Sequence, residues 1–431
     1  MEASSLALMQ VAVIGAGYVG LATAVGLSSL GHQVAVGERD AERVGMLRSG
    51  RSPIFEPELA AMLRVGSEAG RLSFHTSNVD AVAGAEVVFL AVPTPQGEDG
   101  AADTSIVHAV LGEIAGSLSD GALVVLKSTV PVGSVSKVQA TLDEQGARAT
   151  VVSNPEFLRE GSAISDFLHP DRIVIGTDDQ RAAEVMIELY RELQAPIVVT
   201  DPISSEMVKY AANAFLATRI TFANAVARLC EAVGADVKDV LLGMGYDSRI
   251  GFHFFNPGPG FGGSCFPKDT NALVAVAEEA GYDFALLKSV IRINDLQCAH
   301  VVDHVRTGAG GTLHGRTVGM WGLAFKAGTD DTRSSPALAI AERLIEEGCV
   351  LRAHDPQATV SMDGLSQVDT PLDAARDADV LLITTEWPDY QGVDLHEVAR
   401  LMSGDSVVDA RNLLDPDAVR RLGLRYQGIG R

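Results

Sequence analysis

Residues 11–20 read Val11-Ala-Val-Ile-Gly15-Ala-Gly17-Tyr18-Val19-Gly20, and they are the strongest indication of the fold in the first part of the chain. The apolar run predicts a buried strand, and the GxGxxG pattern after it opens a helix-length segment. In that context glycines permit a tight turn and close approach of the backbone to a pyrophosphate at the helix N-terminus. The stretch therefore predicts a dinucleotide-binding unit, with Gly15, Gly17, Tyr18, Val19 and Gly20 at the cofactor.

An acidic residue, Glu38, ends the second expected strand, 18 residues after Gly20. A carboxylate there would accept hydrogen bonds from the ribose hydroxyls and repel a 2′-phosphate, which favours NAD over NADP. A glycine-rich turn without a ligand is the competing interpretation.

The composition is that of an ordinary globular protein, and it argues against some partners. With 431 residues, 47% hydrophobic and 21% charged, we expect two or three domains. The formal net charge of −22 repels phosphate backbones and anionic lipid, so we expect no nucleic acid and no membrane as partner.

Four dispersed cysteines favour free thiols in a reducing cytoplasm, although a disulfide pair stays open. The apolar stretch 6–30, broken by glycines, is interpreted as strand–turn–helix rather than a signal peptide.

Short apolar runs alternate with helix-length segments through the first 200 residues and again after the break Gly308-Ala-Gly310-Gly311. Such alternation predicts parallel sheets covered on both faces. Between them the strand signal disappears, and Asp201-Pro202 predicts the start of a helix that continues to about Val233. The fold class is therefore α/β, with two Rossmann-like doubly wound domains joined by a central helical region with a long helix. The expected boundaries are 1–200, 201–307 and 308–431.

Three segments carry candidate chemistry. The loop Gly258-Pro-Gly-Phe-Gly262-Gly263-Ser264-Cys265 delivers a cysteine to a helix start at Pro267, whose dipole would favour the thiolate. Lys209 and Asn213 share one face of the long helix. Glu156 and Glu160 follow a strand and so lie at the carboxyl edge of the first sheet, where ligands bind. A buried inert cysteine, a solvated helix stripe and plain surface charge are the respective alternatives.

His300 and His304 also share a helical face. With no third ligand in view, we expect a solvated pair and no metal site.

The combination of motifs resembles the UDP-glucose/GDP-mannose dehydrogenase family from about Val11 to Arg431. Eight motifs occur in the family's order. They are Gly15–Gly20, Val92-Pro-Thr94-Pro95, Lys127-Ser128-Thr129-Val-Pro131, Asn154–Gly161, Lys209 with Asn213, Gly262–Asp269, Phe325-Lys326 with Thr329 and Arg333, and Asp409-Ala410-Arg411-Asn412.

The resemblance implies catalytic roles residue by residue. Cys265 resembles the family's nucleophile, with Lys209, Asn213 and Asp269 around it, and Glu156 resembles the general base. Further residues follow in the same way: Thr129 and Glu160 at water and the nicotinamide, Thr94 and Arg333 at NAD, and Glu156, Phe157, Leu158, Lys209, Asn213, Phe254, Gly262, Phe325, Lys326 and Arg411 at the nucleotide sugar. The domains would bind NAD (1–200), form a dimer and the catalytic region (201–307), and bind the nucleotide sugar (308–431). Arg249 resembles an arginine that reaches the neighbouring subunit's sugar, which implies a homodimer.

The activity that the resemblance implies is NAD-dependent four-electron oxidation of UDP-glucose to UDP-glucuronate through a thiohemiacetal and a thioester on Cys265. GDP-mannose, a UDP-N-acetylhexosamine or a catalytically silent sensor are the alternatives. Which of Lys209, Asp269 or water takes the first proton stays open. Two positions depart from the family pattern, Glu38 in place of Asp and Ala410 in place of Gly.

Overall fold

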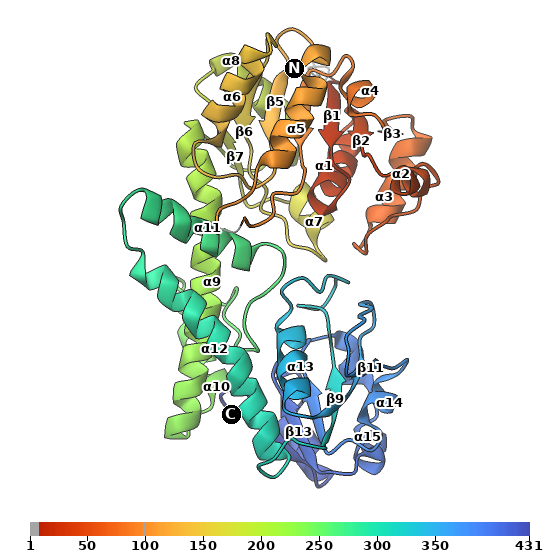
Figure 1. The fold of residues 1–431 in the computed structure, drawn as a ribbon, viewed down its shortest axis with the longest axis vertical. Helices are drawn as coiled ribbons and strands as arrows, with labels where there is room; N and C mark the ends of the chain where they lie inside the picture. The colour runs from red at the N-terminus through yellow and green to blue at the C-terminus, as the bar shows by residue number, and fades with distance from the viewer. Residues whose placement is uncertain (1–7, 98–99) are drawn as a thin grey trace. The chain divides into compact units, whose positions relative to one another are not determined.

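The computed structural model describes residues 8–97 and 100–431, which divide into two compact units (Figure 1). The N-terminal unit is the chain up to Ala212 together with Asn271–Ala280, and the C-terminal unit is Asn213–Thr270 with Gly281–Arg431. Helices α9 (Pro202–Val233) and α11 (Phe266–Glu279) contribute residues to both units. The three-part division expected from the sequence stays a prediction, and its residues 1–7, with the first two residues of the stretch 6–30, lie outside the described part.

The described part of the N-terminal unit contains an eight-stranded sheet in the order β3-β2-β1-β4-β5-β6-β7-β8. Strand β1 lies between β2 and β4, and Val11 pairs with Val34 on one side and Val87 on the other. The strands are β1 Gln10–Ile14, β2 Gln33–Gly37, β3 Leu72–His75, β4 Val87–Leu90, β5 Leu123–Leu126, β6 Thr150–Ser153, β7 Ile173–Gly176 and β8 Ile197–Thr200. One expectation needs correction: β6 and β7 pair antiparallel through Ser153 and Gly176, so β7 and β8 reverse direction. An apolar run carries no sign of its direction, which is why the sequence did not predict this.

Helices cover both faces of this sheet, and alternate residues of β1 enter different cores. Val11 and Val13 pack with α1, α2, α3, α7 and α8, whereas Ala12 and Ile14 pack with α4, α5 and α6. Burial on both faces explains why the strands are continuous apolar runs. The helices are α1 Tyr18–Ser29, α2 Ala41–Arg48, α3 Leu59–Glu68, α4 Asn78–Val82, α5 Ser105–Ile114, α6 Ser134–Glu144, α7 Ala163–Leu168 and α8 Gln180–Leu189, with 3-10 turns at Ala115–Ser117 and Arg191–Leu193.

The C-terminal unit holds a six-stranded parallel sheet in the order β11-β10-β9-β12-β13-β14. Strand β9 ends at Trp321 because Gly322 adopts a positive φ of 104°. The strands are β9 Thr317–Trp321, β10 Val350–His354, β11 Leu365–Gln367, β12 Val380–Ile383, β13 Ser406–Asp409 and β14 Arg425–Gly428. The remaining helices are α10 Val237–Gly245, α12 Ala285–Gly308, α13 Pro336–Glu346, α14 Pro371–Ala375, α15 Leu395–Leu401 and α16 Pro416–Arg421, with a 3-10 turn at Pro388–Gly392.

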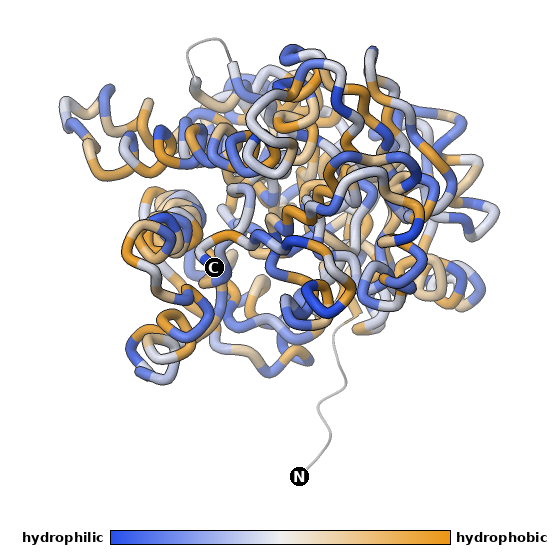
Figure 2. The backbone as a smooth tube through the Cα atoms, turned by 90° about the horizontal axis from the view of Figure 1, so that it is seen from below, coloured by the Kyte–Doolittle hydropathy of each residue, from blue (hydrophilic) through white to orange (hydrophobic). Residues whose placement is uncertain are grey.

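Hydrophobic and hydrophilic segments alternate along the chain (Figure 2). Among the described residues, no helix combines the length and the apolarity that crossing a bilayer requires. The fold class expected from the sequence, two Rossmann-like sheets joined by helices that include the 32-residue α9, is confirmed.

Candidate active site

The glycine loop after β1 has the shape that a dinucleotide pyrophosphate requires. Gly15 has φ +103°, and a Cβ there would lie 2.5 Å from the Ala91 carbonyl oxygen. A Cβ on Gly20 would lie 1.9 Å from the Gly15 oxygen, whereas the space beside Gly17 is open. In the described structure no side chain caps α1 at Gly17, so Tyr18 and Val19 begin a helix whose first N–H groups suit an anion. The loop fits the phosphates of a dinucleotide.

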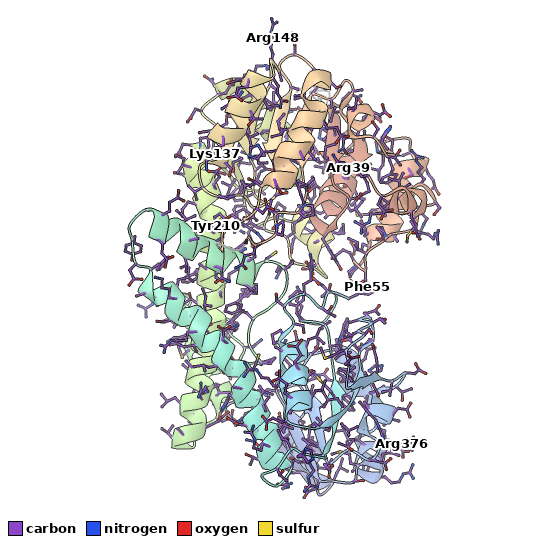
Figure 3. All side chains as sticks on the ribbon, viewed as in Figure 1. Arg39, Phe55, Lys137, Arg148, Tyr210 and Arg376 are labelled. Carbon is purple, nitrogen blue, oxygen red and sulfur yellow. The ribbon has the colours of Figure 1, made fainter. Side chains whose placement is uncertain are left out.

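Glu38 lies beside this loop at the end of β2. Its Oε2 accepts a hydrogen bond from the Ala16 N–H at 3.2 Å, and the Arg43 guanidinium lies 3.7 Å from the same oxygen. The neighbouring Arg39 pairs with Glu113 at 2.5 Å. The Arg39 side chain, which Figure 3 labels, is largely exposed. The Glu38 carboxylate thus contacts the glycine loop at the end of β2, where a ribose ligand is expected.

The loops after β4 and β5 meet at the same sheet edge. The Thr94 hydroxyl donates to the Thr129 carbonyl oxygen at 2.8 Å, and the Ser128 hydroxyl donates to that of Val92 at 2.6 Å. Two residues expected at NAD are thus brought together. Glu160, half-buried, lies in the loop that follows β6.

Glu156 and Lys209 form a buried ion pair within the N-terminal unit. Lys209 Nζ donates to Glu156 Oε1 at 2.8 Å, with 4% and 5% of the two side chains exposed. The Leu158 N–H donates to the other carboxylate oxygen at 2.6 Å. The Phe157 ring lies 5.5 Å from Lys209 Nζ and 3.6 Å from the Arg172 guanidinium. Residues expected at the substrate from two separate motifs therefore form one cluster.

A second buried lysine, Lys127, lies beside this pair, and the sequence analysis assigned it no role. Lys127 Nζ donates to Asn154 Oδ1 at 3.0 Å, and the Tyr190 hydroxyl donates to the same oxygen at 2.7 Å. Burial lowers the pKa of Lys127 to about 8, against the charge of Glu156, which raises it, and together with the charge of Lys209, which lowers it further. Its position directly after β5, at the ligand-binding edge, was the available signal.

The cysteine predicted as nucleophile precedes α11 directly. Asp269, fully buried in the first turn, donates its N–H to the Cys265 carbonyl oxygen at 2.8 Å. Its carboxylate accepts from Asn213 Nδ2 at 2.6 Å and from Lys268 Nζ at 2.7 Å. Asn213, Asp269 and Cys265 are thus connected, and Lys268 is a member of the cluster that sequence reasoning left without a role.

Cys265 differs from the other three cysteines in its exposure to solvent. All four are thiols in the described chain, and Cys265 alone is not buried. Burial raises the pKa of Cys298 and of Cys349 to about 11, which makes those thiols poor nucleophiles.

Glycines let the cysteine loop pack closely within the C-terminal unit. A Cβ on Gly262 would lie 2.1 Å from the Ser334 oxygen, and one on Gly263 would lie 2.7 Å from the Phe325 ring. Asn294 of α12 bonds both the N–H and the carbonyl oxygen of Phe261, at 2.7 and 3.1 Å. The loop is therefore fixed on both sides of its turn.

Basic residues lie next to this loop. Arg411 donates to the carbonyl oxygens of Thr384 and Phe325 at 2.8 and 2.9 Å, and a Cβ on Gly258 would lie 3.3 Å from its guanidinium. The Lys326 ammonium is 5.6 Å from the Phe325 ring centre. Phe325, Lys326, Arg411 and Gly262, expected together at the substrate, all lie in this part of the C-terminal unit.

Phe254, Arg333 and Arg249, three further residues expected at the site, each contact a different neighbour. Phe254 adopts a positive φ of 56° and packs on Phe266, with ring centres 6.0 Å apart. Arg333 donates to both carboxylate oxygens of Asp331, and its role at NAD stays a prediction. The Arg249 side chain is 87% exposed and pairs with Asp247 at 2.6 Å.

Two Rossmann-like sheets, a glycine cradle with a ribose-type carboxylate and an accessible cysteine at a helix start define a dinucleotide-dependent dehydrogenase. Residues 9–194, 203–296 and 319–416 match the NAD binding, central and UDP binding domains of the UDP-glucose/GDP-mannose dehydrogenase family. The chain belongs to this family, and NAD is its cofactor. The family and the cofactor expected from the sequence are confirmed.

Relatives match the chain over nearly its whole length. The UDP-glucose 6-dehydrogenase of Rhizobium meliloti is 45% identical over 98% of this chain and 100% of its own. That of Pseudomonas aeruginosa is 44% identical over 98% of both chains. The solved structure of a UDP-glucose dehydrogenase from the archaeon Pyrobaculum islandicum superposes with a TM-score of 0.92 at 39% identity, covering 100% of this chain and 99% of that one.

Proposed function

We propose that the chain oxidises UDP-glucose to UDP-glucuronate in two NAD-dependent steps, with Cys265 as the nucleophile. The observation that carries the proposal is the full-length similarity to proteins named UDP-glucose 6-dehydrogenase, 44–45% over 98% of the chain. An accessible cysteine before α11 supports it, because oxidation of an alcohol to an acid needs a way to hold the aldehyde between the two steps.

The glycine loop and Glu38 would hold the pyrophosphate and the ribose of NAD, and Thr94, Thr129, Glu160 and Arg333 are the further proposed contacts. NAD, when bound, accepts one hydride in each oxidation. The loss of a hydride and a proton from the sugar alcohol leaves an aldehyde. The Cys265 thiolate then adds to the aldehyde carbon, and the oxygen takes up a proton to give a thiohemiacetal.

The second loss of a hydride and a proton turns the thiohemiacetal into a thioester on Cys265. Water attacks the thioester carbon, Glu156 takes the proton of that water, and the thiolate leaves as the acid forms. Asn213 and Lys209 would stabilise the oxyanion that develops at the carbonyl oxygen. Asp269, which accepts a hydrogen bond from the Asn213 amide, would orient that amide.

The nucleotide sugar is an anion and the chain carries a net charge of −22, so its binding needs a local basic site. Lys326 and Arg411 are the proposed cations beside the loop Gly262–Cys265, and Arg411 also pairs with Glu386 at 2.9 Å. Phe157, Leu158, Phe254 and Phe325 would provide the apolar and backbone contacts of the sugar and the base.

We further propose a homodimer through α9, located in the cytoplasm. Phe215, Phe222 and Leu229 follow at seven-residue spacing, with 62%, 50% and 61% of each residue exposed. A stripe of large apolar residues at that spacing on one face of a long helix is typical of helix–helix association. The exposed Arg249 would reach the sugar bound by the neighbouring subunit. The four cysteine thiols support a reducing compartment.

The test is the stoichiometry with UDP-glucose as the limiting reagent. The proposal expects two NADH per sugar and UDP-glucuronate as the product, identified by mass spectrometry. One NADH per sugar with free aldehyde would overturn the four-electron assignment. A kcat/KM for GDP-mannose or UDP-N-acetylglucosamine above that for UDP-glucose would make that nucleotide sugar the substrate. NAD binding without any turnover would support a catalytically silent sensor.

A further inference from the structure

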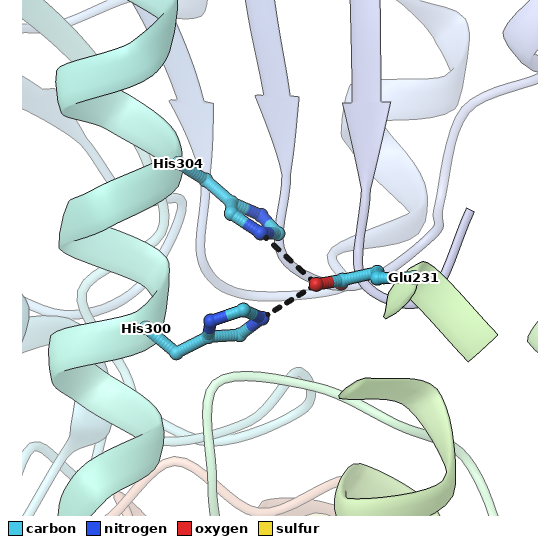
Figure 4. Close-up of side chains that lie close together, drawn as sticks. All are labelled: Glu231, His300 and His304. Carbon is cyan, nitrogen blue, oxygen red and sulfur yellow. Dashed lines mark ion pairs between the residues drawn. The ribbon is translucent and has the colours of Figure 1, made fainter. Parts of the chain in front are cut away.

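Three side chains in the C-terminal unit, outside the proposed active site, converge on one point. Glu231 lies near the end of α9, and His300 and His304 lie one turn apart on α12 (Figure 4). Nε2 of His300 and Nε2 of His304 lie 2.9 and 3.4 Å from the same oxygen, Oε2 of Glu231. One potential ligand atom from each of the three residues lies within 4.8 Å of the other two.

The three side chains are largely buried and held by neighbouring groups. Only 8% of the His304 side chain is exposed, and those of His300 and Glu231 are exposed by 16% and 22%. The second oxygen of Glu231 accepts the Gly430 N–H at 2.7 Å, which leaves Oε2 directed to the two histidines. The Gly430 N–H therefore fixes the orientation of the Glu231 carboxylate.

Both histidines lie at ion-pair distance from the same carboxylate oxygen. Nε2 of His300 is buried and, in the described part of the chain, has no hydrogen-bond partner, although Oε2 of Glu231 is 2.9 Å away. An imidazole nitrogen and a carboxylate oxygen at this separation can be ligands of one metal ion.

We propose that Glu231, His300 and His304 bind a divalent transition-metal ion, with Zn²⁺ as the best fit. Zinc bonds of about 2.0–2.2 Å in a tetrahedron place ligand atoms about 3.4 Å apart, close to the separations found here. Two imidazoles and one carboxylate form a ligand set typical of zinc, and one position is left for water. Ca²⁺ and Mg²⁺, which prefer oxygen ligands, are disfavoured.

The bound ion would connect three segments of the C-terminal unit. Glu231 comes from α9, the histidines come from α12, and the Gly430 N–H ties the end of the chain to Glu231. Gly430 also accepts the Val237 N–H at 3.0 Å, and Arg431 pairs with Asp236 at 3.2 Å. The site thus stabilises the packing of the C-terminal residues after β14 on α9 and α10, and it takes no part in the oxidation.

The experiment is a titration of the chelator-treated, full-length protein with ZnCl₂ by calorimetry and with CoCl₂ by visible absorption. One equivalent of Co²⁺ should give the d–d absorption of a four- or five-coordinate ion, without a thiolate-to-cobalt band. Saturation with Zn²⁺ should raise the melting temperature by roughly 2–5 °C, since the ion binds the folded chain. The absence of a thiolate band excludes binding at Cys265.

The variants Glu231→Gln, His300→Gln and His304→Gln should each weaken binding by about 100-fold or more, because each removes one ligand. Glu231→Gln keeps an acceptor for the Gly430 N–H, so it separates loss of the metal from loss of that bond. His396→Gln, at an exposed histidine of α15, is the matched control and should bind as the wild type does.

The wild-type protein also decides the question alone if a variant fails to fold. Zn²⁺ should protect His300 and His304, but not His396, from diethyl pyrocarbonate, as mapped by peptide mass spectrometry. Equimolar binding that is lost in the three variants supports the site. No equimolar binding, binding that survives in Glu231→Gln, or unprotected His300 and His304 overturns it.

Discussion

Lys209 Nζ lies 2.8 Å from Glu156 Oε1, and almost nothing of either side chain is exposed. Fifty-three residues separate the two in the sequence, and the pair joins the loop after β6 to the first half of α9. Removal of one partner of a buried pair leaves an uncompensated charge and typically costs about 3–5 kcal/mol. Loss of activity after truncation of either residue is therefore ambiguous. A substitution at Glu156 should keep an oxygen that accepts from Lys209 Nζ, and because the Lys209 charge is then unpaired, the free energy of unfolding has to be measured beside the activity.

Glu156→Gln keeps the shape and removes the proposed base. We expect both oxidations to proceed and hydrolysis of the thioester to slow by about 10²–10⁴-fold, the usual effect of a lost general base. A burst of NADH should then be followed by a slow steady rate. Intact-protein mass spectrometry during turnover should find the sugar acid attached to the chain.

Glu192→Gln, at an exposed glutamate of the N-terminal unit, serves as the control and should turn over normally. A Glu156→Gln variant that loses the first hydride transfer as strongly as hydrolysis would remove Glu156 from the role of base.

Lys127 should leave a signature in the pH dependence of stability. Its pKa is about 8 in the folded chain and about 10.4 in an unfolded one, so the folded state binds fewer protons between these values. Stability of the wild type should therefore rise with pH through this window, by about 3 kcal/mol from this group. Below pH 8 Lys127 is charged in both states, so burial of its ammonium lowers the free energy of unfolding by the full amount. Above pH 10.5 Lys127 is neutral in both states, and this destabilisation is absent.

The check is urea unfolding of wild type and Lys127→Met across pH 7–11, followed through the N-terminal unit. The advantage of the Met variant over the wild type should shrink as the pH rises through the window. Lys137→Met, at an exposed lysine of α6, should keep the slope of the wild type (Figure 3). A Met variant whose slope equals that of the wild type would show that Lys127 does not titrate there.

Glu38 should determine the choice between NAD and NADP. Its carboxylate contacts the glycine loop, and Arg43 lies 3.7 Å from it. Glu38→Ala removes a charge that repels a 2′-phosphate and leaves Arg43 to attract one, so the preference for NAD should narrow by about 10-fold or more. The ratio of kcat/KM for the two cofactors measures it, with Glu42→Ala, an exposed acid of α2, as control. Equal use of both cofactors by the wild type would place Glu38 away from the ribose.

Local signals in the sequence predicted the long helix and the glycine loop closely. The helix expected from Asp201-Pro202 to about Val233 is α9, Pro202–Val233, because a proline in its first turn and a glycine with φ +78° after it fix both ends. Gly15 and Gly20 are required by contacts that any side chain would violate. The helix ends and the contact of Gly20 with Gly15 depend on neighbours in the sequence. Gly15 packs against Ala91, 76 residues away, and only the GxGxxG spacing marked it in the sequence.

Features that depend on distant contacts were missed. Strands β3, β11 and β14 are edge strands of their sheets. Their sequences, Leu-Ser-Phe-His, Leu-Ser-Gln and Arg-Tyr-Gln-Gly, show no apolar run. The third member of the histidine cluster, Glu231, lies 69 residues before His300 on another helix. Only the fold brings such residues together.

Every distinctive step of the proposed reaction passes through the sulfur of Cys265. Cys265→Ala leaves a small apolar side chain in a partly exposed position, so the fold and NAD binding should be unchanged. Without the sulfur the aldehyde cannot be held, and formation of the acid should fall by at least about 1,000-fold. Cys298→Ala, at a buried thiol of α12, is the control that keeps the nucleophile.

Cys265→Ser is the sharper probe of the covalent step. A serine hydroxyl can form a hemiacetal and then an ester, and an oxygen ester is hydrolysed much more slowly than a thioester. We expect an enzyme–sugar adduct to accumulate with NAD and UDP-glucose, visible as added mass on the peptide that contains residue 265. If Cys265→Ala still made the acid at near the wild-type rate, the thiol would be structural, and the thiohemiacetal and thioester would have to be abandoned together.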